Sequence, residues 1–177
     1  GTTNVRANLT LGGAAGSFGT GTVTLFDAST VLIFNHTADF TFANNITGLG
    51  ASSGVTKLGT TTLTLTGTND YSGGTVIRGG AIKVGSIATN LGANTIKLGN
   101  VSGDTGTLIY NGTGETTAKT IQVNATSGAS LQSDGTGALV VSSGISAGSS
   151  GTKTFTLKGS NTRNNSVGAI TNGSATT

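Results

Sequence analysis

The residues best suited to acid–base chemistry are few in this chain, and only one of them is a histidine. His36 lies in the segment FNHTADF, three positions before Asp39. A Ser-His-Asp triad would have to use this imidazole, because the sequence holds no second histidine. A lone histidine between two strand-like runs is more often a polar residue of a turn than a catalytic base. We therefore expect His36 to be a turn residue, and we predict no catalytic residue in the chain.

The carboxylates are the other candidates for catalysis or metal binding. An enzyme that cleaves polysaccharide on a coil of strands would stack carboxylates on neighbouring turns, with a base or a Ca²⁺ ion nearby. The acids are instead isolated in the sequence, and the calcium repeat GGxGxD does not occur. Cysteine is absent, which removes disulfides and thiolate metal sites. We predict no metal and no cofactor, although stacking across turns stays open for the six acids: Asp27, Asp39, Asp70, Asp104, Glu115 and Asp134.

The composition predicts a folded chain with a neutral surface. Among 177 residues, 31 are glycine, 34% are hydrophobic and only 8% are charged. Disordered chains are usually poor in apolar residues and rich in charge, so this chain should fold. The net charge of +3 comes from scattered single lysines and arginines, and no basic stripe with interleaved aromatics indicates nucleic-acid binding. No apolar run approaches membrane-spanning length, so we expect no membrane insertion of this segment.

Short strand-like runs recur along the chain, and helix signals are nearly missing. The runs alternate apolar and polar residues and stop at Gly, Asn, Asp or Ser, which favour turns. Their short, uniform length and the echo of residues 56–73 in residues 151–168 favour a parallel β-helix, a solenoid of stacked turns. The same spacing also fits an antiparallel β-sandwich. The runs are residues 22–26, 30–34, 39–42, 62–66, 74–77, 81–84, 95–99, 106–110, 120–123, 138–141 and 154–158.

A solenoid fold predicts the number of turns, the residues that point inward and the contacts of the two ends. Turns of about 20–30 residues, each adding about 4.8 Å, would give roughly six to eight turns. Neither end shows a capping helix or a charged cap, so we expect residues 1–177 to be a single segment that continues in a longer parent or stacks on copies of itself. The expected inward positions are Val23, Leu25, Ile33, Phe40, Phe42, Leu63, Leu65, Val76, Ile82, Val84, Ile96, Leu98, Leu108, Ile121, Val123, Leu139, Val141, Phe155 and Leu157.

The most informative stretch is VTKLGTTTLTLTGTNDYSGGTVIRGGAIKVG, residues 55–85. It reads as a strand, a turn with Asn and Tyr, a strand, a Gly-Gly turn and a third strand. This stretch resembles the passenger-associated transport repeat of bacterial autotransporters. The resemblance implies a right-handed parallel β-helix, secretion to the cell surface, and a part in passenger export and folding. The matching residues are Leu63, Thr64, Leu65, Gly67, Asn69, Tyr71, Ser72, Gly73, Gly74, Thr75, Gly79, Gly80, Ile82 and Val84.

The physical reading of this motif is structural. Its Leu, Ile and Val positions are expected in the core, its glycines at corners, and its Thr and Asn on the surface. Tyr71 follows Asn69 and Asp70 in a turn. An exposed tyrosine could stack on a sugar, but such a residue more often packs over the turn and shields the end of the sheet. We expect the packed arrangement.

Three functions remain after these exclusions. The first is an extracellular structural or adhesive rod of a bacterial surface protein, which could associate head to tail or laterally into fibres. The second is a glycan-cleaving enzyme, which requires a cluster of acids on one face of the folded rod. The third is a module that binds surface polysaccharide. The neutral surface and the isolated acids favour the first.

Overall fold

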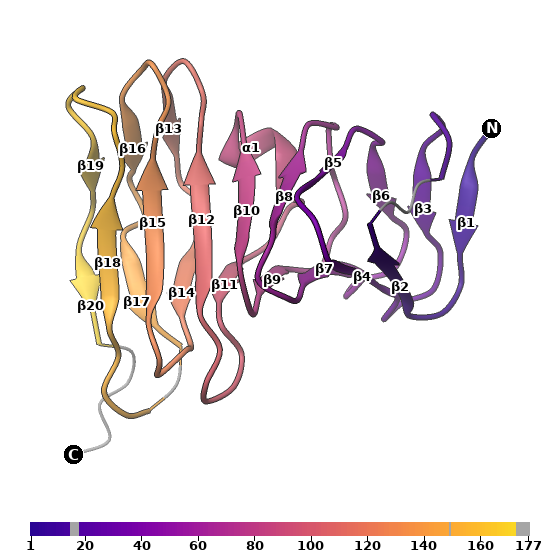
Figure 1. Ribbon diagram of the computed structural model, residues 1–177, viewed down its shortest axis with the longest axis horizontal. Helices are drawn as coiled ribbons and strands as arrows, with labels where there is room; N and C mark the ends of the chain where they lie inside the picture. The colour runs from indigo at the N-terminus through magenta and orange to yellow at the C-terminus, as the bar shows by residue number, and fades with distance from the viewer. Residues whose placement is uncertain (15–17, 149, 173–177) are drawn as a thin grey trace.

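The protein is a parallel β-solenoid of about seven turns. The computed structural model describes residues 1–14, 18–148 and 150–172. Every pairing between its named strands is parallel, so each strand lies beside the equivalent strand of the next turn. Figure 1 shows the turns stacked in chain order from one end of the molecule to the other. The parallel β-helix prediction is confirmed, and the antiparallel sandwich is wrong.

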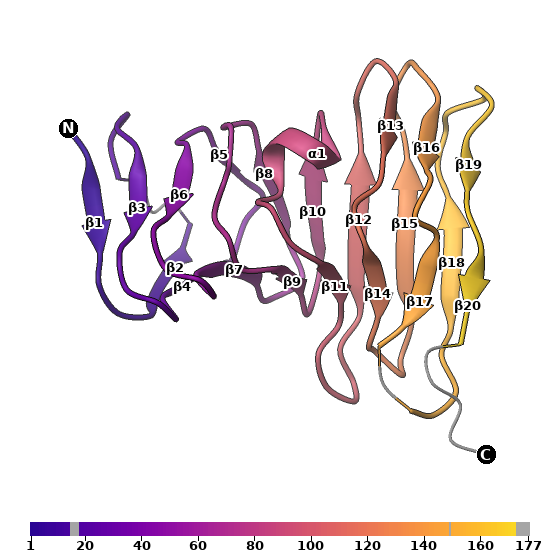
Figure 2. The same cartoon turned by 180° about the vertical axis from the view of Figure 1, so that it is seen from behind.

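Two long sheets form two faces of the solenoid, and the third face carries two shorter sheets. In the views of Figures 1 and 2, the chain ascends one face and descends the others as it advances, consistent with right-handed winding. The eight-stranded sheet contains β2 (Leu9–Gly13), β4 (Val31–His36), β7 (Gly54–Lys57), β9 (Thr75–Ile77), β11 (Ile96–Leu98), β14 (Ile121–Val123), β17 (Ile145–Ala147) and β20 (Ile170–Thr171). The six-stranded sheet contains β5 (Phe40–Phe42), β8 (Thr62–Leu65), β10 (Ala81–Val84), β12 (Gly106–Tyr110), β15 (Ala129–Ser133) and β18 (Phe155–Lys158).

The third face is interrupted in the middle of the molecule. Its first sheet contains β1 (Thr3–Val5), β3 (Val23–Leu25) and β6 (Ile46–Gly48), and its second contains β13 (Glu115–Thr117), β16 (Leu139–Val141) and β19 (Ser166–Val167). On this face, the positions between β6 and β13 are occupied by a loop and then by α1 (Ile87–Asn90), as Figure 2 shows. The sequence did not predict this helix. The motif stretch therefore lies where the third face lacks strands.

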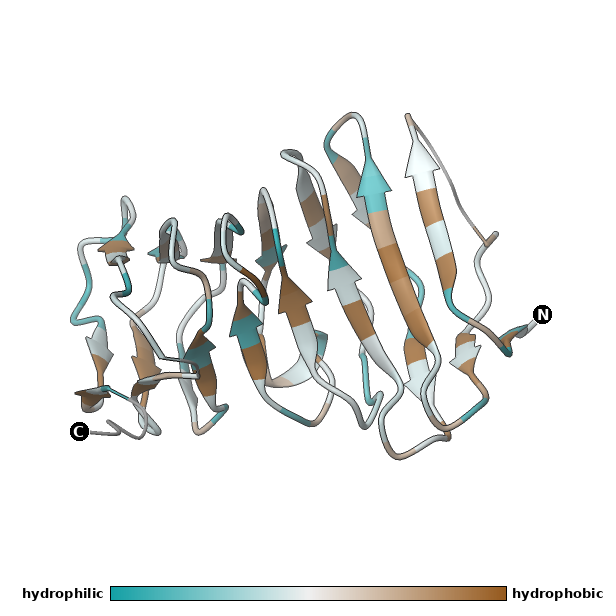
Figure 3. Cartoon of the chain, turned by 90° about the horizontal axis from the view of Figure 1, so that it is seen from below, coloured by the Kyte–Doolittle hydropathy of each residue, from teal (hydrophilic) through white to brown (hydrophobic). Residues whose placement is uncertain are grey.

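The core is a set of aliphatic columns that run along the solenoid axis. Leu63 pairs in register with Phe40 on one side and Ile82 on the other, and all three strands point these residues inward. Leu63 and Ile82 are fully or almost fully buried. Figure 3 shows the same alternation as brown and pale bands along the strands. Each inward side chain thus packs against its equivalents in the neighbouring turns, which buries apolar surface without a helix layer.

Two of the expected inward positions are wrong. In β4 the buried residues are Leu32, Phe34 and His36, while Ile33 is half-buried and faces outward. In β9 the buried residues are Thr75 and Ile77, and Val76 faces outward. Both runs contain consecutive apolar residues, so a period of two could not decide which of them points inward.

The last turn departs from the expectation in a different way. Phe155 and Leu157 hold the register of the inward columns, opposite Ala129 and Leu131. Leu157 is nevertheless 51% exposed, because no further turn covers β18 among the described residues.

Candidate functional site

The broken third face is bridged by side chains of the motif stretch, and Asn69 is the central one. Asn69 is buried, with 5% of its surface exposed. Its Oδ1 accepts a hydrogen bond from the Ile46 N–H of β6 at 2.8 Å, and its Nδ2 donates to the Asn90 carbonyl of α1 at 2.6 Å. Its own backbone N–H donates to the Thr89 carbonyl at 2.9 Å. One side chain therefore joins the turn before it to the turn after it.

Asn90 and Glu115 extend this bridge to the second short sheet. The buried Asn90 donates from Nδ2 to the Gly67 carbonyl at 2.8 Å and accepts the Ser86 N–H at 2.9 Å. Glu115, at the start of β13, accepts the N–H groups of Ile87 and Ala88, both at 2.8 Å. These N–H groups open α1 and have no partner within the helix, so the carboxylate satisfies them. The contacts from β6 to β13 thus combine these side-chain hydrogen bonds with a few backbone ones, such as that from the Asp70 N–H to the Ile46 carbonyl at 3.1 Å.

Tyr71 is fully buried beneath this bridge. Its hydroxyl lies 2.6 Å from the Thr75 hydroxyl, and burial raises the pKa of Tyr71 well above its ordinary value, although the Thr75 hydrogen bond opposes the shift. Gly92 packs against the ring, where an added Cβ would lie 2.3 Å from a ring carbon. The packed position expected for Tyr71 is confirmed, and the sugar-stacking alternative is wrong because no part of the ring reaches the surface.

The motif glycines stand where the backbone of an adjacent turn leaves no room for a side chain. A Cβ on Gly67 would lie 2.2 Å from the Asn44 carbonyl oxygen, and one on Gly73 would lie 2.4 Å from the Ser53 carbonyl oxygen. On Gly80, which has a φ of +59°, it would lie 2.3 Å from the Thr61 carbonyl oxygen. These distances are far below van der Waals contact, so the glycines are required by the close stacking of turns. Gly74 and Gly79 face backbone atoms of neighbouring turns in the same way.

The remaining motif residues fall into two groups. Leu63, Leu65, Ile82, Val84 and Thr75 are buried and lie in the strands β8, β9 and β10. Ser72 is partly buried, and its hydroxyl donates to the Gly50 carbonyl of the preceding turn. Asn69 and Thr75 were expected on the surface, and for both residues that expectation is wrong. The sequence alone could not show that Asn69 is buried, because an asparagine is buried only where the fold supplies hydrogen-bond partners for its side-chain amide.

The comparisons with known proteins agree with this geometry. A family model described as passenger-associated transport repeat matches residues 55–84. The resemblance predicted for residues 55–85 is thereby confirmed. The chain is also 28% identical, over 218 aligned positions, to the protein named Adhesin BmaC autotransporter of Brucella suis biovar 1 (strain 1330). That alignment covers all of this chain and 6% of the relative, so the chain spans a small part of the relative's length. No solved structure matches the chain significantly.

The family match and the similarity to an autotransporter adhesin agree with the predicted export to the bacterial cell surface. No helix among the described residues is long and apolar enough to cross a membrane. Within the repeat, Asn69 forms hydrogen bonds to both neighbouring turns. Strand alternation identified the Leu and Ile positions, whereas Asn90 and Glu115 lie outside the matched stretch and carried no signal in the sequence.

His36 is a core residue, so its expected place in a turn is wrong. It ends β4 with 3% of its surface exposed, and its ring stacks on Phe40 with centroids 4.1 Å apart. Within the described part of the chain, neither ring nitrogen has a hydrogen-bond partner. Burial, and then the charge of Lys57, lower the pKa of His36. The imidazole is thus held neutral and away from solvent, an arrangement that suits packing and not proton transfer to a substrate.

Lys57 is buried beside this histidine, which is unusual for an ammonium group. Its Nζ donates to the Leu58 carbonyl at 2.5 Å and lies 3.4 Å from the Gly59 carbonyl. Burial lowers the pKa of Lys57, and Asp39 opposes the shift. No signal in the sequence marked this lysine among the others.

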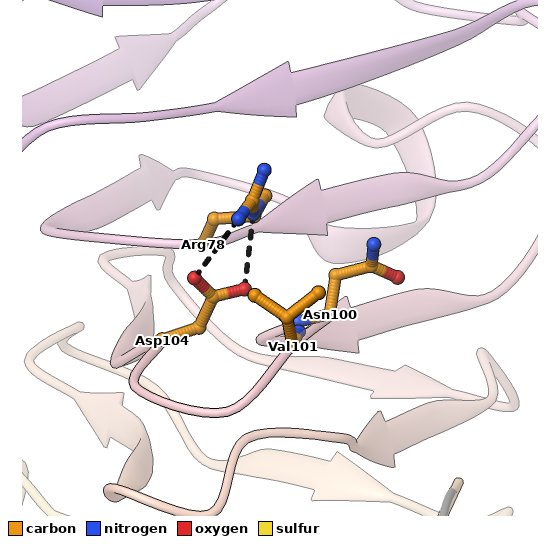
Figure 4. A network of polar contacts seen from close by, with 4 residues as sticks. All are labelled: Arg78, Asn100, Val101 and Asp104. Atoms are coloured by element: carbon orange, nitrogen blue, oxygen red, sulfur yellow. Dashed lines mark hydrogen bonds and ion pairs between the residues drawn. The ribbon is translucent and has the colours of Figure 1, made fainter.

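The acids are used to tie neighbouring turns together. Asp39 accepts the Thr62 N–H at 2.8 Å, and Asp134 accepts the Ser160 N–H at 2.9 Å, each across one turn of the solenoid. Asp104 pairs with Arg78 at 3.0 Å and also accepts the N–H groups of Asn100 and Val101 (Figure 4). Burial opposes ionisation of Asp104, but these hydrogen bonds outweigh it and hold its pKa below the ordinary value.

The titratable residues described above thus make structural contacts. Among the described residues, no group of three or more His, Cys, Asp or Glu side chains could hold a metal ion. The arrangement of the acids gives the glycan-cleaving alternative no support. What the geometry does support is a scaffold in which one repeat joins turns whose third face has no strand.

Proposed function

We propose that this chain is a structural segment of an adhesive rod on the bacterial surface, and that its open ends stack on further solenoid turns. The observation that carries the proposal is the parallel stacking of turns along both long sheets, which leaves edge strands at both ends. The match to an autotransporter repeat and the similarity to a protein named an adhesin support the surface and adhesive part. Unpaired edge strands favour association, because they present free N–H and C=O groups.

The C-terminal end has the apolar surface that such stacking needs. Leu157 continues the inward column of Leu131, and Ile170 continues that of Ile145. They are 51% and 59% exposed, respectively. A hollow of about 300 Å³ beside Leu157 is lined by the apolar side chains of Leu131, Leu139 and Val167 and by polar residues such as Asn161 and Asn165. In the isolated chain, the occupant that we propose for this end is the N-terminal end of a second copy, where Leu9, Leu11 and Phe40 are only partly buried.

Sedimentation velocity over a range of protein concentrations tests the stacking. We expect the sedimentation coefficient to rise with concentration, and Leu157→Lys and Ile170→Lys to abolish the rise by placing a charge in the contact. Leu49→Lys is the matched control, because Leu49 is 67% exposed but lies at a corner away from both ends. A chain that stays monomeric at the highest concentration, or that associates equally well in all three variants, would contradict the proposal.

A further inference from the structure

The outer face of the six-stranded sheet carries a trough that none of the structural contacts above uses. Its volume is about 560 Å³, and it crosses the turns from β8 to β18. Its lining is mainly small and hydroxyl-bearing, with Thr107, Ser130 and Thr156 from three successive strands. It is open along its length, so it fits an extended molecule better than a compact one.

One wall of the trough is formed by the corners that precede the strands. Thr105 belongs to the connection of residues 99–105 between β11 and β12, and Ser127 and Gly128 belong to the next connection, residues 124–128. In Figures 1 and 2 these corners extend further beyond the strands than the connection between β9 and β10. The Arg78–Asp104 pair fixes the first corner, and the Ser102 and Thr126 hydroxyls join the two corners at 3.1 Å. The wall is therefore an ordered feature.

The floor of the trough carries a column of hydroxyls in register. Thr107 pairs with Ser130, and Ser130 pairs with Thr156. The Thr107 and Ser130 hydroxyls lie 2.8 Å apart, and one of their two protons makes the bond between them. The second proton and the remaining lone pairs can then bond a ligand, chiefly at the half-buried Thr107, because Ser130 is only 7% exposed and a hydroxyl is both a donor and an acceptor. Such a column suits the hydroxyl-rich face of a sugar chain.

The charges around the trough favour an acidic ligand. Lys158 lines it at the end nearest the C-terminus, and no acidic residue lines it among the residues that the structure describes. Lys83 stands in the same column of side chains, followed in register by Ile109, Gln132 and Lys158. Asp134 lies close enough to Lys83 for that charge to contribute to its lowered pKa, although its hydrogen bonds from Ser160 and Gln132 contribute more. Lys158 is thus the cation that an incoming carboxylate would meet.

We propose that this trough binds a linear acidic polysaccharide, with the hydroxyl column contacting the sugars and Lys158 pairing with a carboxylate. The proposal rests on the surface function proposed above and names the ligand class. Ile109 offers an apolar contact beside the column, and it is half-buried. The trough runs along the solenoid axis, so a chain of sugars would contact several turns at once. Several weak contacts along one ligand give the affinity that single surface hydroxyls lack.

Titration calorimetry with an oligogalacturonate of defined length tests the proposal on the full chain. We expect Lys158→Gln and Thr107→Val each to weaken binding about tenfold, since each removes a contact to the ligand. The Lys158 variant should also lower the dependence of binding on salt concentration. Arg163→Gln and Thr116→Val remove the same kinds of group from exposed positions outside the trough, and binding should stay within about twofold of the original chain.

Two further ligands separate this proposal from its alternatives. A neutral galactan should bind more weakly than the oligogalacturonate, and polyglutamate should bind more weakly because it has no sugar hydroxyls. Equal binding of either ligand, unchanged binding in the trough variants, or no binding of oligogalacturonate would overturn the proposal. Far-UV circular dichroism of each variant confirms that the fold is kept. A chain that associates end to end but binds no oligogalacturonate would remove the trough site and leave the rod function in place.

Discussion

The turns around the transport repeat and the turns that follow it hold the solenoid together by different means. On the third face of the C-terminal turns, β13, β16 and β19 pair through backbone hydrogen bonds. On the same face of the repeat, the side chains of Asn69, Asn90 and Glu115 add connections to a few backbone hydrogen bonds, such as that from the Asp70 N–H to the Ile46 carbonyl. The corners differ as well, because β9 and β10 are joined by residues 78–80 while β11 and β12 are joined by residues 99–105.

The family match covers residues 55–84, the part of the chain whose third face lacks strands. A backbone ladder accepts almost any side chain that alternates correctly, but the C-terminal turns also contain glycines with no room for a side chain, such as Gly112 and Gly137. A bridge of buried side chains accepts only the residue types whose donors and acceptors fit, and close backbone contacts accept only glycine. What sets the repeat apart is the buried asparagine bridge across its strandless third face. The longer corners of the later turns, in contrast, leave room for a surface trough.

The largest effect is expected where a glycine contacts the backbone of a neighbouring turn, as Gly73 of the repeat does. Gly73→Ala would place a Cβ 2.4 Å from the Ser53 carbonyl oxygen and should lower the free energy of unfolding by about 3 kcal/mol or more, or prevent folding. Gly85→Ala is the matched control, because an added Cβ there meets nothing within 4 Å, and its effect should stay within about 0.5 kcal/mol. Urea unfolding measures both. Equal stability of the two variants would break the comparison.

The next largest effect is expected at Asn69. Asn69→Ala leaves the Ile46 N–H and the Asn90 carbonyl without their partner in a buried site, which should cost about 2–4 kcal/mol in urea unfolding. Asn165 makes comparable contacts in the C-terminal turns, since its Oδ1 accepts the Leu139 N–H at 2.8 Å, but it is exposed. Water can replace it, so Asn165→Ala should cost only about 1 kcal/mol. A larger loss for Asn165→Ala would reverse our account of the two regions.

The apolar and the polar residues of the core differ in how well the sequence predicts their burial. Alternation in the motif was enough to place Leu63, Leu65, Ile82 and Val84 in the core, and short uniform strands were enough for the solenoid. The spacing from Asn44 to Asn69 and from Asn69 to Asn90 is irregular, so the buried asparagines did not stand out as a series. The burial of His36 and Lys57 was equally hidden. Polar residues enter this core because particular rings and carbonyls surround them, and those contacts exist only after the turns stack.

Lowering the pH should have a smaller effect on stability, and the effect should begin in β4 and β7, which contain His36 and Lys57. Burial and Lys57 lower the pKa of His36 from its ordinary 6.5. Below about pH 6.5, His36 therefore binds a proton in the unfolded chain but stays neutral in the folded chain. The free energy of unfolding should then fall by up to about 1.4 kcal/mol per pH unit as the pH is lowered. Asp104 and Asp134 have pKa values lowered from 3.8, so their contribution is lost only at more acidic pH.

Urea unfolding between pH 7 and pH 5 measures this effect, and His36→Phe should remove most of the pH dependence in that window. The phenyl ring keeps the stacking on Phe40 and cannot be protonated. Hydrogen exchange at pH 5 should show the first loss of protection in β4 and β7, which contain His36 and Lys57. An unchanged slope in the variant, or a first loss in β12 and β15, would separate His36 from the acid response.

The smallest effect is expected at the corner of residues 99–105. Asp104→Asn weakens the pair with Arg78 and the bonds from two backbone N–H groups, but the corner is partly exposed, so global stability should fall by less than about 1 kcal/mol. Limited proteolysis should nonetheless cut this corner faster than in the original chain. Gly85→Ala, which does not touch the corner, should leave the cleavage rate unchanged. Resistance equal to that of the original chain would show that the ion pair does not order the corner.

Native-state hydrogen exchange on the unchanged chain tests the central claim most directly. If the side chains of the repeat are what join the turns across the broken face, the Ile46 and Asn69 amides should exchange only through global unfolding. The Leu139 amide, bonded to the exposed Asn165, should exchange faster through local opening. We therefore expect the slowest exchange at the repeat. Slower exchange of the Leu139 amide than of the Ile46 and Asn69 amides would contradict the account.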